Sequence, residues 1–263
     1  MEFFPQKLKG QIPFKNGLVE SKISGVHRGR GKLYEFENDP NKIIRVISFD
    51  SLRKIYHNQI DPVSLAGLGK KLYKELETTY DIPVPVEYIA GRDAQRKDVI
   101  YGITEKITGE NLVRINVTPE IASQVEKLYT SLSQYYINKF SKLPDGEIYL
   151  ADISGASQYV YGTKTDDDQS RMYLVDTDLF MRNGKAAFYY VITEFIRDMI
   201  SVERKFDKQF DDARKNIEQI LLNSSLEGLS SEETEKIKKA VIKARDFLDG
   251  RFSKESGAFP TDV

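Results

Sequence analysis

Three aspartates stand out because each lies at or just beyond the end of an apolar run. Asp152 follows Ile148–Ala151, and Asp176 follows Met172–Val175, with Asp178 two positions further on. A carboxylate at the end of a buried strand is costly unless a cation or hydrogen-bond donors meet it. The pattern therefore indicates either acidic positions that hold a positively charged ligand, or a plain loop cap at Asp152 and a strand-end turn at Asp176.

The segments around these aspartates are typical of strands that lie side by side. We expect strands at Glu147–Ile153, Gln158–Tyr161 and Met172–Val175, with the polar connector Gly162–Ser170 between the last two. Antiparallel pairing places the start of one strand beside the end of its neighbour. We therefore predict that the hairpin brings the two acidic positions together at its open end.

Paired carboxylates of this kind suit a magnesium ion and phosphate chemistry. Mg²⁺ is bound by few protein oxygens, keeps several waters and takes phosphate oxygens as further ligands. In phosphoryl transfer, one aspartate positions the attacking hydroxyl while another holds the metal. Asp152 and Asp176 would fit that division of labour if they converge.

Composition excludes several other kinds of site. The chain has 263 residues, a net charge of −1, no cysteine and only His27 and His57 as histidines. Disulfides, cysteine-bound zinc and thiol catalysis are thereby excluded, and histidine-based triads have few candidates. The near-neutral charge does not favour nucleic acid as a partner. We expect no secretory signal at Met1–Gly10 and no membrane span. The expected location is cytoplasmic, with secretion left open.

The first hundred residues read as strand-rich. Two runs of β-branched and aromatic residues flank the turn Glu37–Asn41, and together they predict a hairpin. Leucines at spacings of three and four predict a helix over Ser64–Tyr80. The expected strands of this region are Lys32–Phe36, Lys42–Phe49, Val86–Ala90 and Val99–Lys106, and Gln11–Ile23 is a further candidate strand.

The rest of the chain reads as mainly helical. Thr118 followed by Pro119 predicts a capped helix start, and Ser230 with Glu233 has capping-box spacing. Further helices are expected over Ala186–Phe206 and Asp207–Leu222. We therefore predict an α+β fold with a small antiparallel β-rich lobe (residues 1–108), a linker near Glu105–Leu112, and a helical lobe (residues 109–263) that carries the hairpin.

Four segments carry a resemblance to a known family. They are the glycine-rich Gly25–Phe36, the strand Lys42–Val46, Ile82–Pro85 followed by the strand and hinge Tyr101–Leu112, and the pair Leu150-Ala-Asp152 with Leu174-Val-Asp176-Thr-Asp178. Together they resemble the protein-kinase-like superfamily, closest to its aminoglycoside phosphotransferase and choline-kinase branch. The resemblance spans roughly Gly25 to Phe180, and the terminal helices match only in kind.

The resemblance implies a two-lobed protein-kinase-like fold and an ATP- and Mg²⁺-dependent phosphotransferase. It implies that Asp152 orients the acceptor hydroxyl, which belongs to an unidentified small molecule or protein. Asp176 would bind Mg²⁺, with Asp178 as a second ligand or loop support. The second metal position would fall to Ser157 or Gln158. The implied nucleotide contacts are Gly29, Gly31, Arg45, Glu105 and Ile107, with Glu75 or Glu77 as the helix partner of Arg45.

The sequence departs from the family pattern at four positions, one of which is the third loop glycine, where Tyr34 stands. Arg45 stands where the family has lysine, Leu150 where it has histidine, and Ser157 where it has asparagine. A planar guanidinium is not equivalent to a compact ammonium. Two alternatives to the phosphotransferase therefore stay open. One is a pseudokinase that acts as a binding or scaffolding module, and the other is an enzyme of the same fold that transfers a nucleotide onto a protein. A secreted bacterial effector is left open for either of them.

Overall fold

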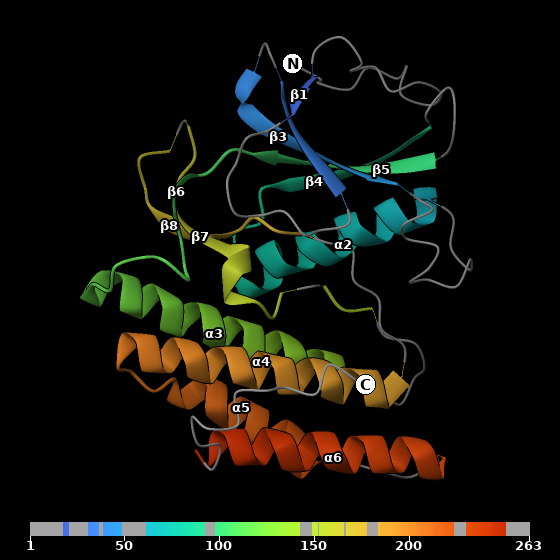
Figure 1. Cartoon of the computed structure of the whole chain (residues 1–263), viewed down its shortest axis with the longest axis vertical. Coiled ribbons are helices and arrows are strands. Elements are labelled where there is room, and N and C mark those ends of the chain that lie inside the picture. The colour runs from blue at the N-terminus through green and yellow to red at the C-terminus, as the bar shows by residue number, and fades with distance from the viewer. Residues whose placement is uncertain are drawn as a thin grey trace. The chain divides into compact units, whose positions relative to one another are not determined.

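The protein is described from a computed structural model over residues 18–20, 31–36, 39–48, 62–92, 98–142, 149–151, 153–165, 167–177, 184–223 and 230–250. The chain forms two compact units. The first combines Met1–Arg114 with Gln158–Met181, and the second combines Ile115–Ser157 with Arg182–Val263. The sheets lie in the first unit and most of the helices in the second (Figure 1).

The first unit is built on a five-stranded antiparallel sheet in the order β1-β2-β3-β5-β4. Its strands are β1 (Leu18–Glu20), β2 (Gly31–Phe36), β3 (Asp39–Ser48), β4 (Val86–Arg92) and β5 (Asp98–Glu105). Helix α2 (Pro62–Tyr80) packs on β4 and β5 (Figure 1). The leucines at helical spacing make this contact, since Leu65, Leu72 and Leu76 are buried.

A second, three-stranded sheet completes this unit. It contains β6 (Thr108–Asn111), β7 (Tyr159–Thr163) and β8 (Arg171–Leu174) in the order β6-β7-β8. Gly109 of β6 lies opposite Gly162 of β7. A Cβ atom added at Gly109 would lie 2.1 Å from the carbonyl oxygen of Tyr161, so the two strands approach as closely as they do because both residues lack side chains.

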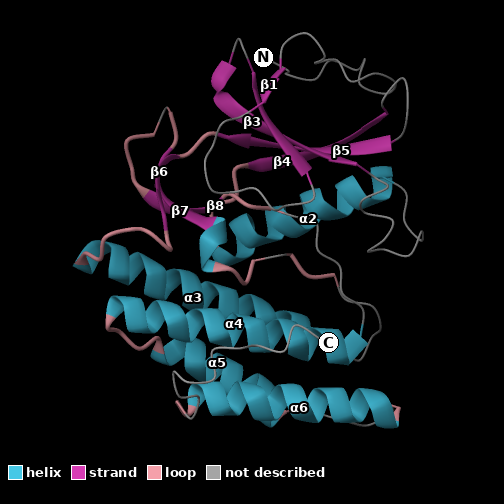
Figure 2. Ribbon diagram, viewed as in Figure 1, coloured by secondary structure: helices cyan, strands magenta, loops and turns pink. Residues whose placement is uncertain are grey.

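The second unit is a group of helices (Figure 2): α3 (Pro119–Phe140), α4 (Gly184–Phe206), α5 (Asp211–Leu222) and α6 (Ser231–Leu248). Helix α3 packs against α4 and α5, and α4 packs against α6. Aromatic side chains fill the space between them, as in the stacked pair Tyr129 and Phe210, whose ring centroids are 5.3 Å apart. None of the helices in the described part of the chain is both long and apolar enough to cross a membrane.

The structure confirms the α+β class, the antiparallel sheet, the hairpin of β7 and β8, and both predicted helix starts. Thr118 Oγ1 accepts a hydrogen bond from the amide of Ile121 at 3.3 Å, and the capping box of Ser230 and Glu233 is complete. Helix α5 begins at Asp211 rather than Asp207, because Asp207 has a positive φ of 47° and ends the preceding helix. Of the predicted segment Gln11–Ile23, the described part is β1.

The structure differs from the sequence predictions in two stretches. The predicted linker Glu105–Leu112 contains β6, which pairs with β7 and so lies in the first unit. The predicted strand Glu147–Ile153 is absent from its described residues, where only Tyr149 makes an isolated bridge. The neighbouring Leu150, Ala151 and Ile153 are all buried, whereas a half-buried strand would alternate between buried and exposed positions. The division into functional lobes at residue 108 stays a prediction.

Candidate functional site

The central feature of the first unit is an ion pair between Arg45 and Asp176. Arg45 lies in the middle of β3, opposite Leu33 on β2 and Gly102 on β5. Its side chain is only 10% exposed, and its Nη2 contacts Oδ1 of Asp176, whose side chain is 31% exposed. A cation in the middle of a sheet needs such a partner, because burial without one is costly. Two predicted site residues are thereby brought together.

Backbone hydrogen bonds hold the segment that carries Asp176. The carbonyl oxygen of Gln158 accepts hydrogen bonds from the amides of Val175 and Asp176, at 2.9 Å and 3.4 Å. One residue earlier, the amide of Leu174 donates to the carbonyl of Pro83 at 3.0 Å. The carboxylate is therefore placed by main-chain contacts on both sides of the segment, and its location does not depend on the ion pair alone.

Tyr88 and Thr177 are two further supports that the sequence analysis did not identify. The hydroxyl of Tyr88, on β4, donates to the carbonyl of Thr177, and both residues are buried. The ring of Tyr88 lies 5.5 Å from that of Tyr73 on α2. Thr177, the residue after Asp176, is thus tied to β4, and through Tyr88 to α2. A tyrosine that bonds to a backbone group so distant in the sequence leaves no local signal by which it could have been predicted.

Glu105, a predicted nucleotide contact at the end of β5, is held by a backbone hydrogen bond and an ion pair. The amide of Glu105 donates to the carbonyl of Pro85 at 3.2 Å, and its carboxylate pairs with Nζ of Lys164 at 2.7 Å. The same ammonium lies 5.8 Å from the ring centroid of Tyr173 on β8. The pKa of the Tyr173 hydroxyl is raised above its ordinary value, mainly by burial. Ile107 follows, half-buried, and its contact with a nucleotide stays a prediction.

The two glutamates proposed as partners of Arg45 differ in their surroundings. Glu77 is exposed and pairs with Lys74 of its own helix at 3.4 Å, whereas Glu75 is half-buried on α2. A functional role for either glutamate stays a prediction. The ion pair described above gives Arg45 a partner that the sequence analysis did not foresee, since it assigned Asp176 to the metal.

The remaining predicted residues fall into two groups. Gly31 begins β2 opposite Ile47, while Ser157 is exposed and Gln158 is buried. The others lie outside the described residues, and the convergence of the two acidic positions therefore stays a prediction. These others are Gly29, Asp152 and Asp178.

The residues present suit a magnesium ion that is held partly by phosphate. Within the described ranges no group of three aspartate, glutamate, histidine or cysteine side chains could hold a metal on its own. Asp176 offers one partly exposed carboxylate. Mg²⁺ characteristically takes few carboxylates and completes its shell with water and phosphate oxygens. This donor set therefore fits a nucleotide-bound Mg²⁺ and not a cage made by protein side chains alone.

No protein-family model matches the chain, and no curated protein does either. Among solved structures, the chain is similar to a microcompartment-associated aminopropanol kinase, with 12% identity, 89% of this chain and 93% of that chain covered, and a TM-score of 0.37. It is also similar to the GDP complex of aminoglycoside 2′-phosphotransferase IIIa, with 10% identity, 89% and 94% covered, and a TM-score of 0.36. A third similar structure is WbdD, with 10% identity, 86% and 53% covered, and a TM-score of 0.39. Likeness at this level identifies no functional residue in this chain.

Proposed function

We propose that the protein is a phosphotransferase that moves the γ-phosphate of ATP to a hydroxyl group, with Mg²⁺ as its cofactor. The observation that carries the proposal is the ion pair of Arg45 and Asp176, which places a cation of β3 in contact with a carboxylate just beyond the end of β8. Phosphoryl transfer needs both kinds of group, since the phosphates require a cation and the metal requires a carboxylate. The fixed main chain around Asp176 supports a positioning role.

The proposed mechanism assigns one task to each side chain. Arg45 holds phosphate oxygens of ATP, because a guanidinium has several N–H donors and suits phosphate geometry. Asp176 would hold the magnesium ion, which when bound would supply charge neutralisation for the phosphates. Asp152 orients the acceptor hydroxyl and accepts its proton, so that an oxygen–phosphorus bond forms as the bond to ADP breaks. Catalysis is then mainly positioning and charge neutralisation.

The same ion pair also supports a second candidate, a nucleotide-binding or scaffolding module without turnover. The guanidinium of Arg45 already neutralises the carboxylate that a metal ion would need. In this alternative, the contact is a permanent structural bond across the first unit. The two candidates differ in one respect that is readily measured, because only the enzyme consumes ATP in a Mg²⁺-dependent manner.

The test measures release of phosphate from ATP, with and without Mg²⁺, by the full chain. We expect Asp176→Asn to lower the Mg²⁺-dependent rate on the order of a hundredfold or more, as when a group that stabilises transition-state charge is removed. Asp168→Asn is the matched control, because Asp168 is an exposed aspartate in the connector between β7 and β8. Equal rates for wild type and Asp176→Asn would refute the assignment. Binding without turnover in the wild type would favour the scaffolding module.

A further inference from the structure

Tyr135 of α3 holds the main chain immediately before Asp152. Its hydroxyl oxygen accepts a hydrogen bond from the amide of Ala151 at 3.0 Å. Both residues are buried, at 0% and 1% exposure. A buried amide outside regular structure needs an acceptor, and this tyrosine provides one from a different element. The ring alone would fill the core equally well, so the hydroxyl has a separate role.

Asp198 of α4 holds the same segment on its other side. Its Oδ2 accepts a hydrogen bond from the amide of Ala156 at 2.6 Å. Burial raises the pKa of the Asp198 carboxyl, against the opposing effect of this amide. A carboxylate placed where burial disfavours its charge is retained at a cost in stability, which indicates that the contact with Ala156 has a use.

The apolar residues next to Asp152 in the sequence are buried. Leu150, Ala151 and Ile153 are 0%, 1% and 0% exposed. Asp152 itself lies outside the described residues, but its neighbours on both sides are described and held. The segment is therefore fixed by apolar burial and by side chains from two helices of the same unit, although it has no strand ladder of its own.

We propose that Tyr135 and Asp198 are positioning residues of the phosphoryl-transfer reaction, which fix the segment that presents Asp152 to the acceptor hydroxyl. This inference rests on the proposed function. Positioned catalysis is sensitive to small displacements, because a misplacement of about 1 Å can lower a rate on the order of a hundredfold. Loss of either contact should thus lower turnover without weakening nucleotide binding, because neither residue is among the proposed nucleotide contacts.

The experiment uses the full chain and three variants: Tyr135→Phe, Asp198→Asn and Asp198→Ala. The first readout is amide hydrogen exchange at Ala151 and Ala156. We expect exchange about tenfold faster at Ala151 in Tyr135→Phe and at Ala156 in Asp198→Ala, because each loses its acceptor. Asp198→Asn keeps an acceptor oxygen and should show a smaller change. Tyr190→Phe is the control, since Tyr190 is exposed on α4.

The second readout is Mg²⁺-dependent ATP turnover. We expect kcat to fall roughly tenfold or more in Tyr135→Phe and Asp198→Ala, with KM for ATP unchanged and Asp198→Asn intermediate. An unchanged kcat in variants whose exchange is faster would overturn the positioning role. Unchanged exchange would overturn the anchoring itself, whether or not the wild type turns over. An inactive wild type would instead refute the proposed function, so the two failures are distinguishable. If Asp198→Ala does not fold, the milder Tyr135→Phe and Asp198→Asn variants still decide the question.

Discussion

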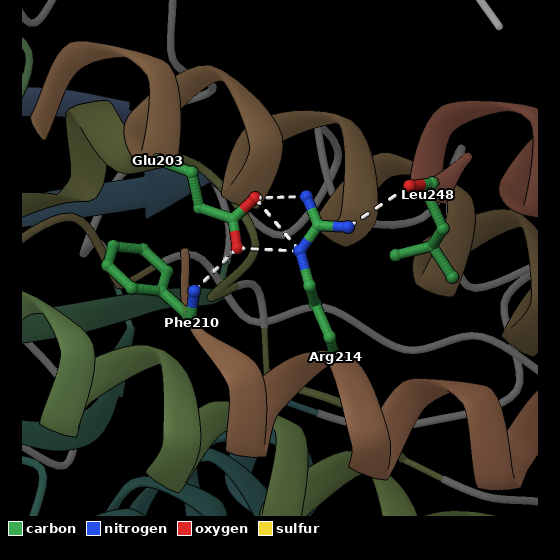
Figure 3. Close-up of polar contacts among 4 residues, drawn as sticks. All are labelled: Glu203, Phe210, Arg214 and Leu248. Atoms are coloured by element: carbon green, nitrogen blue, oxygen red, sulfur yellow. Dashed lines mark hydrogen bonds and ion pairs between the residues drawn. The ribbon is translucent and has the colours of Figure 1, made fainter. Parts of the chain in front are cut away.

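Arg214→Met tests how the helices of the second unit are held together. Glu203 of α4 accepts hydrogen bonds at Oε1 from the amide of Phe210 at 2.7 Å and from Nε of Arg214 at 2.8 Å (Figure 3). Its Oε2 accepts from Nη2 of the same arginine at 2.5 Å. The guanidinium also donates from Nη1 to the carbonyl of Leu248, at the end of α6, at 3.0 Å. One arginine on α5 therefore joins α4 to α6.

The burial of the two partners sets the size of the effect. The side chain of Glu203 is 6% exposed and that of Arg214 is 19% exposed, so the glutamate is the more costly group to leave unpaired. Breaking a buried ion pair from one side costs about 3–5 kcal/mol. The remaining Phe210 amide lowers the cost, and we expect about 3 kcal/mol for Arg214→Met. Glu203→Gln keeps the shape and an acceptor, and we expect only ~1–2 kcal/mol.

The assay is equilibrium unfolding in urea, followed by far-ultraviolet circular dichroism, which reports mainly on the helices. The matched control is Arg197→Met, which breaks a more exposed pair with Glu194 on α4 and should cost less than ~1 kcal/mol. A loss in Arg214→Met no larger than in this control would refute the reasoning. A larger loss in Glu203→Gln than in Arg214→Met would also contradict it, because the order follows directly from the burial of the two partners.

Two further predictions concern a strand contact and a titration. Gly162→Ala would place a Cβ 2.3 Å from the carbonyl oxygen of Thr108, so we expect the free energy of unfolding in urea to fall by about 1–3 kcal/mol or more. The control is Gly67→Ala on α2, whose added Cβ would meet nothing within 4 Å and which should be neutral or slightly stabilising. Equal losses in the two variants would refute the close approach of the strands. Burial raises the pKa of the Asp198 carboxyl above its ordinary 3.8, and folding therefore favours the protonated form. The contribution of Asp198 to the free energy of unfolding should fall as the pH rises from about 3.8 through the raised pKa. The free energy of unfolding of Asp198→Asn, relative to that of wild type, should therefore rise over that range and then level off. A difference in unfolding free energy that does not change with pH would contradict this.

Local patterns were sufficient where one face of an element is buried. The leucines of α2 and the caps at Thr118 and Ser230 are signals within a few residues, and they predicted the elements correctly. Strand β6 has no such signal, because Thr108–Asn111 lacks β-branched and aromatic residues apart from its first threonine. Its pairing depends on the distant Gly162, which can be recognised only once the two strands are seen together.

Two residues of the candidate site, Arg45 and Asp176, were singled out from the sequence, but the contact between them was not. The types and positions of Arg45 and Asp176 indicated a role for each, but not the ion pair between them, since a long stretch of chain separates them. The predicted strand at Glu147–Ile153 was wrong for a related reason. Its described apolar residues are buried, and the amide of Ala151 bonds to the Tyr135 side chain of α3 and not to a neighbouring strand.

The most direct test of the central claim is calorimetric titration of the full chain with ATP in the presence and absence of Mg²⁺. If Asp176 holds a nucleotide-bound magnesium ion, the wild type should bind ATP at least about tenfold more tightly with Mg²⁺ than without it. Asp176→Asn should lose that difference, and the exposed control Asp168→Asn should keep it. An affinity that ignores Mg²⁺ in the wild type, or a difference that survives in Asp176→Asn, would contradict the proposed function.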